Sequence, residues 1–328
     1  MSSSDLLAQL SSLPTESFRA DLARIDELPT LDIARLMNRE DAGVPAAVAS
    51  QLPVISAAVD AIAPRMGRGG RLIYLGAGTA GRLGVLDASE CPPTFNTSPG
   101  QVVGLIAGGV GAMVDSVEGA EDSRESAVRD LQGLSLRADD TVVGVSASGR
   151  TPYAVGGVQY ARGRGALTVG VACNPGSALG AAAEYGIEVV VGGEFVTGST
   201  RLKAGTAQKL VLNMISTITM IRLGKTYGNL MVDVRASNEK LRARSRRIVA
   251  LATGAQEAAI EVALTATGGE VKNAVLVLLG GVDAVTAGRV LEECGGRLRE
   301  ALDVVGAGAG GSSGGGGSRS TRSTHHES

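Results

Sequence analysis

The middle of the chain alternates short apolar runs with stretches of helical spacing. Five runs are rich in Val, Ile and Leu and nearly free of polar residues, as is typical of strands that are covered on both faces. Each run ends in a turn, and apolar positions at helical spacing recur between the runs. The expected strands are residues 71–75, 101–107, 141–145, 166–172 and 187–191. This pattern predicts an α/β fold with a doubly wound, five-stranded parallel sheet flanked by helices.

Helices are predicted on either side of this region as well as within it. Residues 17–41 have apolar positions at helical spacing, with Asp32 as a candidate start cap. A second helix is expected over residues 44–66, with an interruption near Pro53. Further helices are expected over residues 115–131, over residues 200–223 and, separated by glycines, between residues 237 and 302.

These patterns predict four parts. A helical N-terminal segment, an α/β domain, a small helical domain for packing or dimerisation and a disordered Gly/Ser-rich tail are expected at residues 1–65, 66–236, 237–305 and 306–328.

The composition excludes several classes of function. The 328 residues carry a net charge of −2, 2% aromatic residues and no Trp, which argues against a nucleic-acid partner. Both histidines lie in the tail, so a general acid or base in the folded body must be Asp, Glu, Lys, Tyr or Cys, and neither a serine triad nor a metal site is expected. Three scattered cysteines, no apolar run of about 20 residues and no signal-peptide pattern predict a cytoplasmic protein without a membrane partner.

A glycine loop follows the first expected strand. Its Gly76-x-Gly78-x-x-Gly81 spacing matches the dinucleotide fingerprint, but it is equally typical of a tight turn without a ligand. An NAD site expects an acidic residue at the end of the next strand, where this chain has Ala107-Gly108-Gly109. NAD is therefore disfavoured, and no cofactor is expected.

A second loop, residues 146–151 (SASGRT), also follows a strand and precedes a helix. Alone it would read as an ordinary helix cap, and Arg150 could be a solvated surface residue. Backbone N–H groups at a helix start, surrounded by hydroxyls, form a cradle for phosphate. Two such loops at neighbouring strand ends favour a sugar phosphate as the ligand.

Acidic residues supply the candidate chemistry. Glu90 precedes Pro92-Pro93, a pair expected to end the helix and to hold the carboxylate on a rigid break. Residues 117–123 contain several acids, a composition more often found on a solvated helix face. The pattern alone does not choose between Glu118, Glu121 and Asp122.

Long strings of the sequence resemble the N-acetylmuramic acid 6-phosphate etherase family. They are GAGTAGRLGVLDASECPPTF, GLIAGG, VEGAEDS, SASGRTPY, TGSTRLKAGTAQK and YGNLMVDVRASNEKLRARS, and the likeness extends from Asp26 to Leu302. The resemblance implies a sugar isomerase (SIS) domain with a small helical C-terminal domain. It also implies a cytoplasmic homodimer, with sites near the subunit interface, that recycles peptidoglycan sugars without a metal or cofactor.

By this resemblance, Glu90 and Glu121 match the two catalytic glutamates. The expected substrate-binding residues are Gly78, Thr79, Ala80, Ser89, Ser146, Ser148, Gly149 and Thr151. The implied reaction eliminates D-lactate from C3 of the sugar and then adds water. One glutamate must be ionised and the other protonated; we expect Glu90 to be the acid and Glu121 the base, although the two roles can be exchanged.

Two departures from the family pattern stand out. Ala80 replaces the serine of the usual GAGTSG loop, so one hydroxyl contact to the ligand is in doubt while the backbone N–H is kept. The usual Thr-Glu-x-x-Asn becomes Thr15-Glu16-x-x-Arg19, which weakens any role carried over to the N-terminal segment. Two alternatives stay open: a non-catalytic SIS-domain sugar-phosphate sensor, and a sugar-phosphate isomerase.

Overall fold

The computed structural model describes residues 13–234 and 239–310, which form two compact units divided between Leu223 and Gly224. The first unit contains a five-stranded, all-parallel sheet of order β2-β1-β3-β4-β5, as the apolar runs predict. The strands are β1 (Leu72–Gly76), β2 (Val102–Ile106), β3 (Thr141–Val145), β4 (Leu167–Ala172) and β5 (Tyr185–Glu188).

The order of the strands locates the ligand-binding edge. The chain adds β2 on one side of β1 and all later strands on the other, so the topological switch lies between β1 and β3. Gly76, the last residue of β1, is in register with Val145, the last residue of β3. Ligands of open α/β sheets bind beyond the carboxyl ends of the strands at such a switch point.

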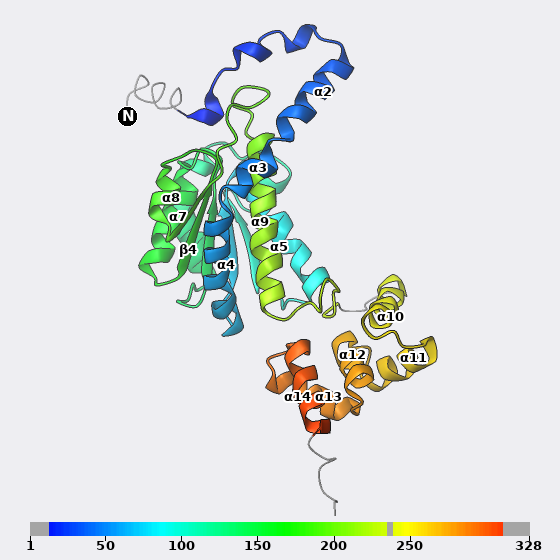
Figure 1. The fold of residues 1–328 in the computed structure, drawn as a ribbon. Helices are drawn as coiled ribbons and strands as arrows, with labels where there is room; N and C mark the ends of the chain where they lie inside the picture. The colour runs from blue at the N-terminus through cyan, green and yellow to red at the C-terminus, as the bar shows by residue number, and fades with distance from the viewer. Residues whose placement is uncertain (1–12, 235–238, 311–328) are drawn as a thin grey trace, which may run out of the picture. The chain divides into compact units, whose positions relative to one another are not determined.

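Helices cover both faces of the sheet. Helices α4, α5 and α9 lie on one face, and α6, α7 and α8 lie on the other (Figure 1). Their bounds are α4 (Leu52–Gly67), α5 (Gly78–Phe95), α6 (Arg124–Gly133), α7 (Pro152–Gly163), α8 (Ala178–Ala182) and α9 (Lys203–Arg222). The inner strands β1, β3 and β4 are wholly buried, whereas the edge strands β2 and β5 are only partly buried.

The N-terminal residues are less helical than their pattern predicts. Residues 14–27 form three short 3₁₀ turns, and α2 (Thr30–Asp41) begins directly after Pro29, with Asp32 in its first turn instead of at its cap. The break near Pro53 is present, because α3 (Val44–Ala49) ends before α4 begins.

Two other elements have limits different from those expected. Strand β5 ends at Glu188 instead of residue 191. Val189 is buried although it follows the strand, so its apolar side chain extends the pattern that predicts a strand. The helix expected from residue 115 begins only with α6, since Gly119 turns the chain with a φ of +70° and the Ser123 hydroxyl then caps α6.

The proline pair does not end α5. The helix continues through Pro92 and Pro93 to Phe95, and the N–H of Asn96 donates to Pro92 O at 3.0 Å in a left-handed cap. The prolines lie in the last two turns, where Cys91 and Phe95 are buried against the sheet unit. Packing of these side chains holds the helix where the prolines alone predict its end.

The second unit is a bundle of short helices with its own core. They are α10 (Glu239–Thr253), α11 (Glu257–Ala266), α12 (Val271–Gly280), α13 (Ala284–Glu293) and α14 (Leu298–Gly310). Residues 224–234 belong here because Val232 and Val234 enter this core and the Lys272 ammonium donates to Gly224 O at 3.0 Å. The boundary expected after residue 236 and most of the expected tail lie outside the described residues, whereas α14 continues helical beyond residue 305.

Among residues 13–234 and 239–310, no single helix is long and apolar enough to cross a membrane. Three pairs of helices joined at sharp bends meet the same test of length and composition.

Candidate functional site

Two helices begin at the switch point. Helix α5 starts directly after β1, and its first turn carries the expected ligand residues Gly78, Thr79 and Ala80. Gly78 has a φ of +51°, and a Cβ on Gly81 would lie 2.7 Å from Gly76 O. The glycines of the fingerprint therefore allow a tight strand-to-helix turn, and the N–H groups of a first helical turn are a common binding site for anions.

Residues 146–151, the expected site of a phosphate and for that reason called the phosphate loop, join β3 to α7. The hydroxyl of Ser146 lies 2.8 Å from that of Thr151 and 3.3 Å from that of Ser148, and it accepts from Gly149 N at 3.1 Å. Gly149 has a φ of +68°, and a Cβ there would lie 2.4 Å from Ser177 Cβ. The loop is thus a compact, internally bonded turn that only glycine permits at this position.

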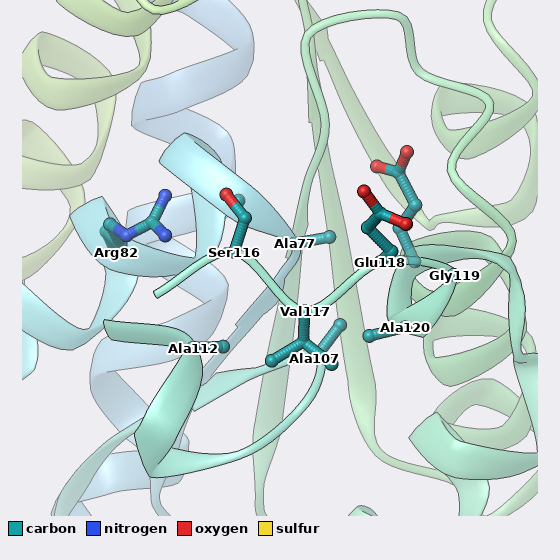
Figure 2. Close-up of a pocket in the computed structure, with 11 residues that line it drawn as sticks. Ala77, Arg82, Ala107, Ala112, Ser116, Val117, Glu118, Gly119 and Ala120 are labelled. Carbon is teal, nitrogen blue, oxygen red and sulfur yellow. The ribbon is translucent and has the colours of Figure 1, made fainter. Parts of the chain in front are cut away.

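A cavity of about 360 Å³ opens beside the first turn of α5. It is lined by Ala77, Gly78, Arg82, Ala107, Ala112, Ser116, Val117, Glu118, Gly119, Ala120 and Glu121. Figure 2 shows Arg82 on one side of it and Glu118 on the other. The structure therefore brings Gly78 and Glu121 to one cavity. Of the three candidate acids, Glu118 and Glu121 line this cavity and Asp122 does not.

The residues between β2 and α6, numbers 107–123 and here called the glutamate segment, carry these acids. The segment folds back on itself, since a Cβ on Gly108 would lie 2.9 Å from Val117 Cβ. Gly119 then starts the 3₁₀ turn Ala120–Asp122, and Ser123 caps α6. Glu121 is held by this short turn, and its exposed carboxylate makes no hydrogen bond or ion pair with the described residues.

Arg82 is a site residue that the sequence reasoning missed. It lies one turn into α5, lines the cavity and donates from Nε to Met113 O at 3.1 Å, which ties the glutamate segment to the helix. Of the residues that line the cavity it is the one with a positive charge. Its place directly after the glycine fingerprint was the available signal, since residues of the first helical turns border any ligand bound there.

Glu90 and Ser89 lie apart from this cavity. Both are exposed on α5, and the Ser89 hydroxyl donates to Leu86 O at 2.8 Å. At a rise of 1.5 Å per residue, Glu90 is about 18 Å along the helix from Gly78. Within one copy of the chain, Glu121 lines the cavity and Glu90 does not.

Asp87 anchors the part of α5 that carries Glu90. Its buried carboxylate accepts from the Tyr74 hydroxyl at 2.7 Å, from Asn213 Nδ2 at 2.6 Å and from the Ser216 hydroxyl at 3.1 Å. Burial raises the pKa of Asp87, and these three donors oppose that rise. The helix is thereby tied to β1 and α9 one turn before Glu90.

Ala80 is buried in the main core, and its methyl group packs with the sheet-facing side chains. Thr79 is half-buried, with its methyl near Gly205 of α9. Only backbone groups of Ala80 are available to a ligand. In the part of the chain that the structure describes, no cluster of three His, Cys, Asp or Glu side chains could hold a metal ion.

Comparison with known proteins identifies the family of the chain. Residues 54–162 match the glucokinase regulatory protein N-terminal SIS domain, and residues 120–218 match the SIS domain. The chain is 75% identical to an N-acetylmuramic acid 6-phosphate etherase of Streptomyces avermitilis and 78% identical to that of Streptomyces coelicolor, over 90% and 91% of its length and 96% of each relative. It is 55% identical to an Escherichia coli protein of the same name, over 90% of this chain and 99% of that one. The chain therefore belongs to the N-acetylmuramic acid 6-phosphate etherase family.

Proposed function

We propose that this protein is an N-acetylmuramic acid 6-phosphate etherase. It replaces the D-lactyl ether at C3 of its substrate with a hydroxyl group, which yields N-acetylglucosamine 6-phosphate and D-lactate for the recycling of peptidoglycan sugars. One observation carries this proposal: the hydroxyl-rich turn after β3 and the glutamate-lined cavity after β2 flank β1 and the first turn of α5. Relatives of this name that are 55–78% identical support it.

The phosphate of the substrate is assigned to the phosphate loop and the N-terminus of α5. The N–H groups of Ser148 and Thr151 have no acceptor among the described residues, so they remain available to an anion. The two helix dipoles favour negative charge at the same place. Binding energy gained here, remote from C2 and C3, holds the sugar against the catalytic groups.

The reaction needs two carboxyl groups in opposite protonation states. Opening of the sugar ring exposes an aldehyde at C1, which acidifies the C2 proton. A carboxylate removes that proton, and the electron pair forms a C2–C3 double bond as lactate leaves with a proton from a carboxylic acid. Water then adds at C3, and a proton returns to C2, so that the net change is hydrolysis of the ether.

Glu121 is assigned as the base at C2 and Glu90 as the acid that protonates lactate and then activates water. The position of Glu121 in the cavity, next to the turn that binds the phosphate, supports its role. The assignment of Glu90 rests on the resemblance, and the two roles can be exchanged. Without a histidine in the described chain, carboxyl groups are the natural choice for both steps.

A homodimer would supply the missing glutamate. Glu90 is exposed, does not line the cavity of its own chain and lies about 18 Å along α5 from Gly78, so we propose that it acts in the site of a second copy. Leu86, one turn before it on α5, is 51% exposed, and Ile218 and Ile221 are exposed on the neighbouring helix α9. A second copy that covered these side chains would bury apolar area next to Glu90.

Chemically the enzyme would be a carbon–oxygen lyase that works without a cofactor. We place it in the cytoplasm, and the state of its cysteines supports that location. Cys91 and Cys173 are free and buried, and burial raises the pKa of each thiol to about 12. Neither thiol is therefore a reactive nucleophile that competes with the glutamates.

The test is release of D-lactate from N-acetylmuramic acid 6-phosphate by the purified full-length chain. We expect Glu121→Gln and Glu90→Gln each to lower kcat by about 10²–10⁴-fold, the usual contribution of a general acid or base. Asp122→Asn is the matched control, because Asp122 is exposed beside Glu121 but does not line the cavity. Its rate should stay within about threefold of the wild-type rate.

Each failure of this test has a distinct meaning. A folded wild-type protein that binds the sugar phosphate but releases no lactate would be a sugar-phosphate sensor. Conversion of the sugar phosphate to an isomer without lactate would identify an isomerase. Equal losses in Asp122→Asn and Glu121→Gln would remove the special role of Glu121.

A further inference from the structure

The N-terminal residues touch the phosphate loop through one buried asparagine. Asn174 follows β4, is 1% exposed, and donates from Nδ2 to Ala147 O, in the middle of the loop, at 3.0 Å. The same amide contacts Thr15, which is fully buried although it lies in the first short turn of the described chain. Thr15 N donates to Asn174 Oδ1 at 3.2 Å, and Asn174 Nδ2 donates to the Thr15 hydroxyl at 2.9 Å.

The orientation of the Asn174 amide is determined by its partners. A backbone N–H can only donate and a backbone carbonyl can only accept, so Thr15 N requires the amide oxygen and Ala147 O requires the amide nitrogen. A flipped amide would lose both bonds. Thr15 therefore holds Asn174 in the single orientation that serves the phosphate loop.

The loop needs this support because a phosphate cradle must turn its carbonyl oxygens away from the anion. Ala147 O is occupied twice, by Cys173 N at 2.9 Å and by Asn174 Nδ2, and Gly149 O accepts from Leu179 N at 2.9 Å. A carbonyl that was free to rotate toward the phosphate would repel it and would remove neighbouring N–H groups from it. Asn174 thus favours the anion-binding form of the loop.

A second contact holds the N-terminal residues in place. Arg19 Nη1 donates to Glu40 Oε2 at 2.8 Å, and the buried Lys203 ammonium at the start of α9 donates to the same oxygen at 2.9 Å. Arg19 stands where the family pattern has Asn, and here it forms an ion pair with Glu40 while Thr15 keeps its buried contacts. The departure from the pattern therefore leaves the contact with the phosphate loop intact.

We infer that Thr15 and Asn174 are positioning residues that keep the phosphate loop in its anion-binding conformation, so that the N-terminal turn contributes to recognition of the 6-phosphate. Neither side chain needs to touch the substrate. Because the pair serves the sugar-phosphate site, the inference rests on the function proposed above. The N-terminal turn, although far from the phosphate loop in sequence, would thus help the site to discriminate phosphorylated from unphosphorylated sugars.

The experiment compares Asn174→Ala, Thr15→Val and Thr15→Ser in the full-length chain. Calorimetry measures the Kd of N-acetylglucosamine 6-phosphate, and lactate release gives kcat/KM for N-acetylmuramic acid with and without its 6-phosphate. Asn174→Ala should weaken binding of the phosphorylated sugar about tenfold, and Thr15→Val about threefold, as expected for lost buried hydrogen bonds. Thr15→Ser keeps the hydroxyl and should bind like the wild type.

A merely structural role would give a different result. Lower stability reduces the active fraction and lowers the rate for both sugars equally, whereas loss of loop positioning raises KM for the phosphorylated sugar alone. Thr141→Val is the matched control, because the Thr141 hydroxyl is buried at the other end of β3 and has no partner among the described residues. It should leave both Kd and the ratio of the two kcat/KM values unchanged.

Several outcomes would overturn the inference. They are a wild-type Kd in folded Asn174→Ala, equal Kd values in Thr15→Val and Thr15→Ser, and equal losses for both sugars. If Asn174→Ala does not fold, the two Thr15 variants decide the question. Absence of lactate release by the wild type would reject the etherase function alone, since calorimetry still tests the loop.

Discussion

The phosphate loop and the glutamate segment follow β3 and β2, the two strands that flank β1, but they are built differently. In the phosphate loop, Ser146 and Gly149 are buried and the polar groups bond to one another. In the glutamate segment, Val110 and Val114 are 88% and 85% exposed, and Glu121 makes no hydrogen bond with the described residues. The first region pairs its polar groups within one chain, whereas the second leaves apolar and acidic groups exposed among the described residues.

This difference suggests that one chain suffices for binding of the sugar phosphate, whereas the chemical step needs a dimer. Under the proposed function, recognition of phosphate requires donors that are fixed before the ligand arrives, and the phosphate loop of one chain would supply them. Protonation of the leaving group requires a second carboxyl group, and in one chain Glu90 lies too far away. We therefore expect a single chain to bind the sugar phosphate but not to cleave its ether.

The strongest test of this comparison mixes two inactive variants. Glu90→Gln and Glu121→Gln, unfolded and refolded together, should recover about one quarter of the wild-type rate, because half of the dimers are mixed and each has one intact site. D-lactate release measures the recovery from rates that are about 10²–10⁴-fold lower in each variant alone.

The two variants refolded separately and then combined are the control, and they should stay inactive if subunits exchange slowly. No recovery in the mixture that was refolded together, despite verified mixed dimers, would mean that both glutamates act within one chain.

A smaller effect is expected from Gly149→Ala, which tests whether the phosphate loop is preformed. The added Cβ meets Ser177 Cβ at 2.4 Å and the residue keeps a φ of +68°, so the loop must distort at a cost of about 1–3 kcal/mol. The Kd of N-acetylglucosamine 6-phosphate should rise about 10–100-fold, as measured by calorimetry.

Gly176→Ala is the control that separates the effect of backbone strain from distortion of the phosphate loop. Gly176 follows β4 with a φ of +61°, and an added Cβ there meets no atom within 4 Å. It should lower the free energy of unfolding without changing the Kd. Equal changes of Kd in both variants would argue against a preformed loop.

The smallest effect concerns acid stability of the N-terminal residues that support the phosphate loop. Hydrogen bonds from Arg19 and then from Lys203 lower the pKa of Glu40 from 4.5 to about 2. A carboxyl group whose pKa is lower in the folded state stabilises the fold at any pH above its pKa in the unfolded state. For Glu40 this contribution is lost as the pH falls from about 4.5 to about 2.

Glu40→Gln should therefore lower the free energy of unfolding near neutral pH, and its difference from the wild type should shrink as the pH falls through that window. Denaturant titrations at several pH values measure the difference. Asp41→Asn is the control, because Asp41 forms no ion pair among the described residues. A difference between Glu40→Gln and wild type that does not change with pH would contradict the assignment.

Local patterns predicted the sheet well because buried parallel strands need continuous apolar runs. All five strands lie at or next to their predicted positions, and the glycine breaks of the second unit separate its helices as expected. The patterns failed where packing competes with a local signal. Buried Phe95 and Cys91 carry α5 past its prolines, and Gly119 turns the chain where acidic residues resemble a helix face.

The sequence by itself determined the fold class and the two glycine-containing turns at the strand ends, and it left residues other than histidine as the candidate acids and bases of the folded body. Apolar runs, glycine spacing and the position of both histidines in the tail are local or compositional features. Only the tertiary structure decided which acids share a cavity with α5, that Glu90 is remote from them, and that Thr15 reaches the phosphate loop through Asn174. These relations join residues far apart in the chain, and their distances depend on how the sheet orders its strands and how its helices pack.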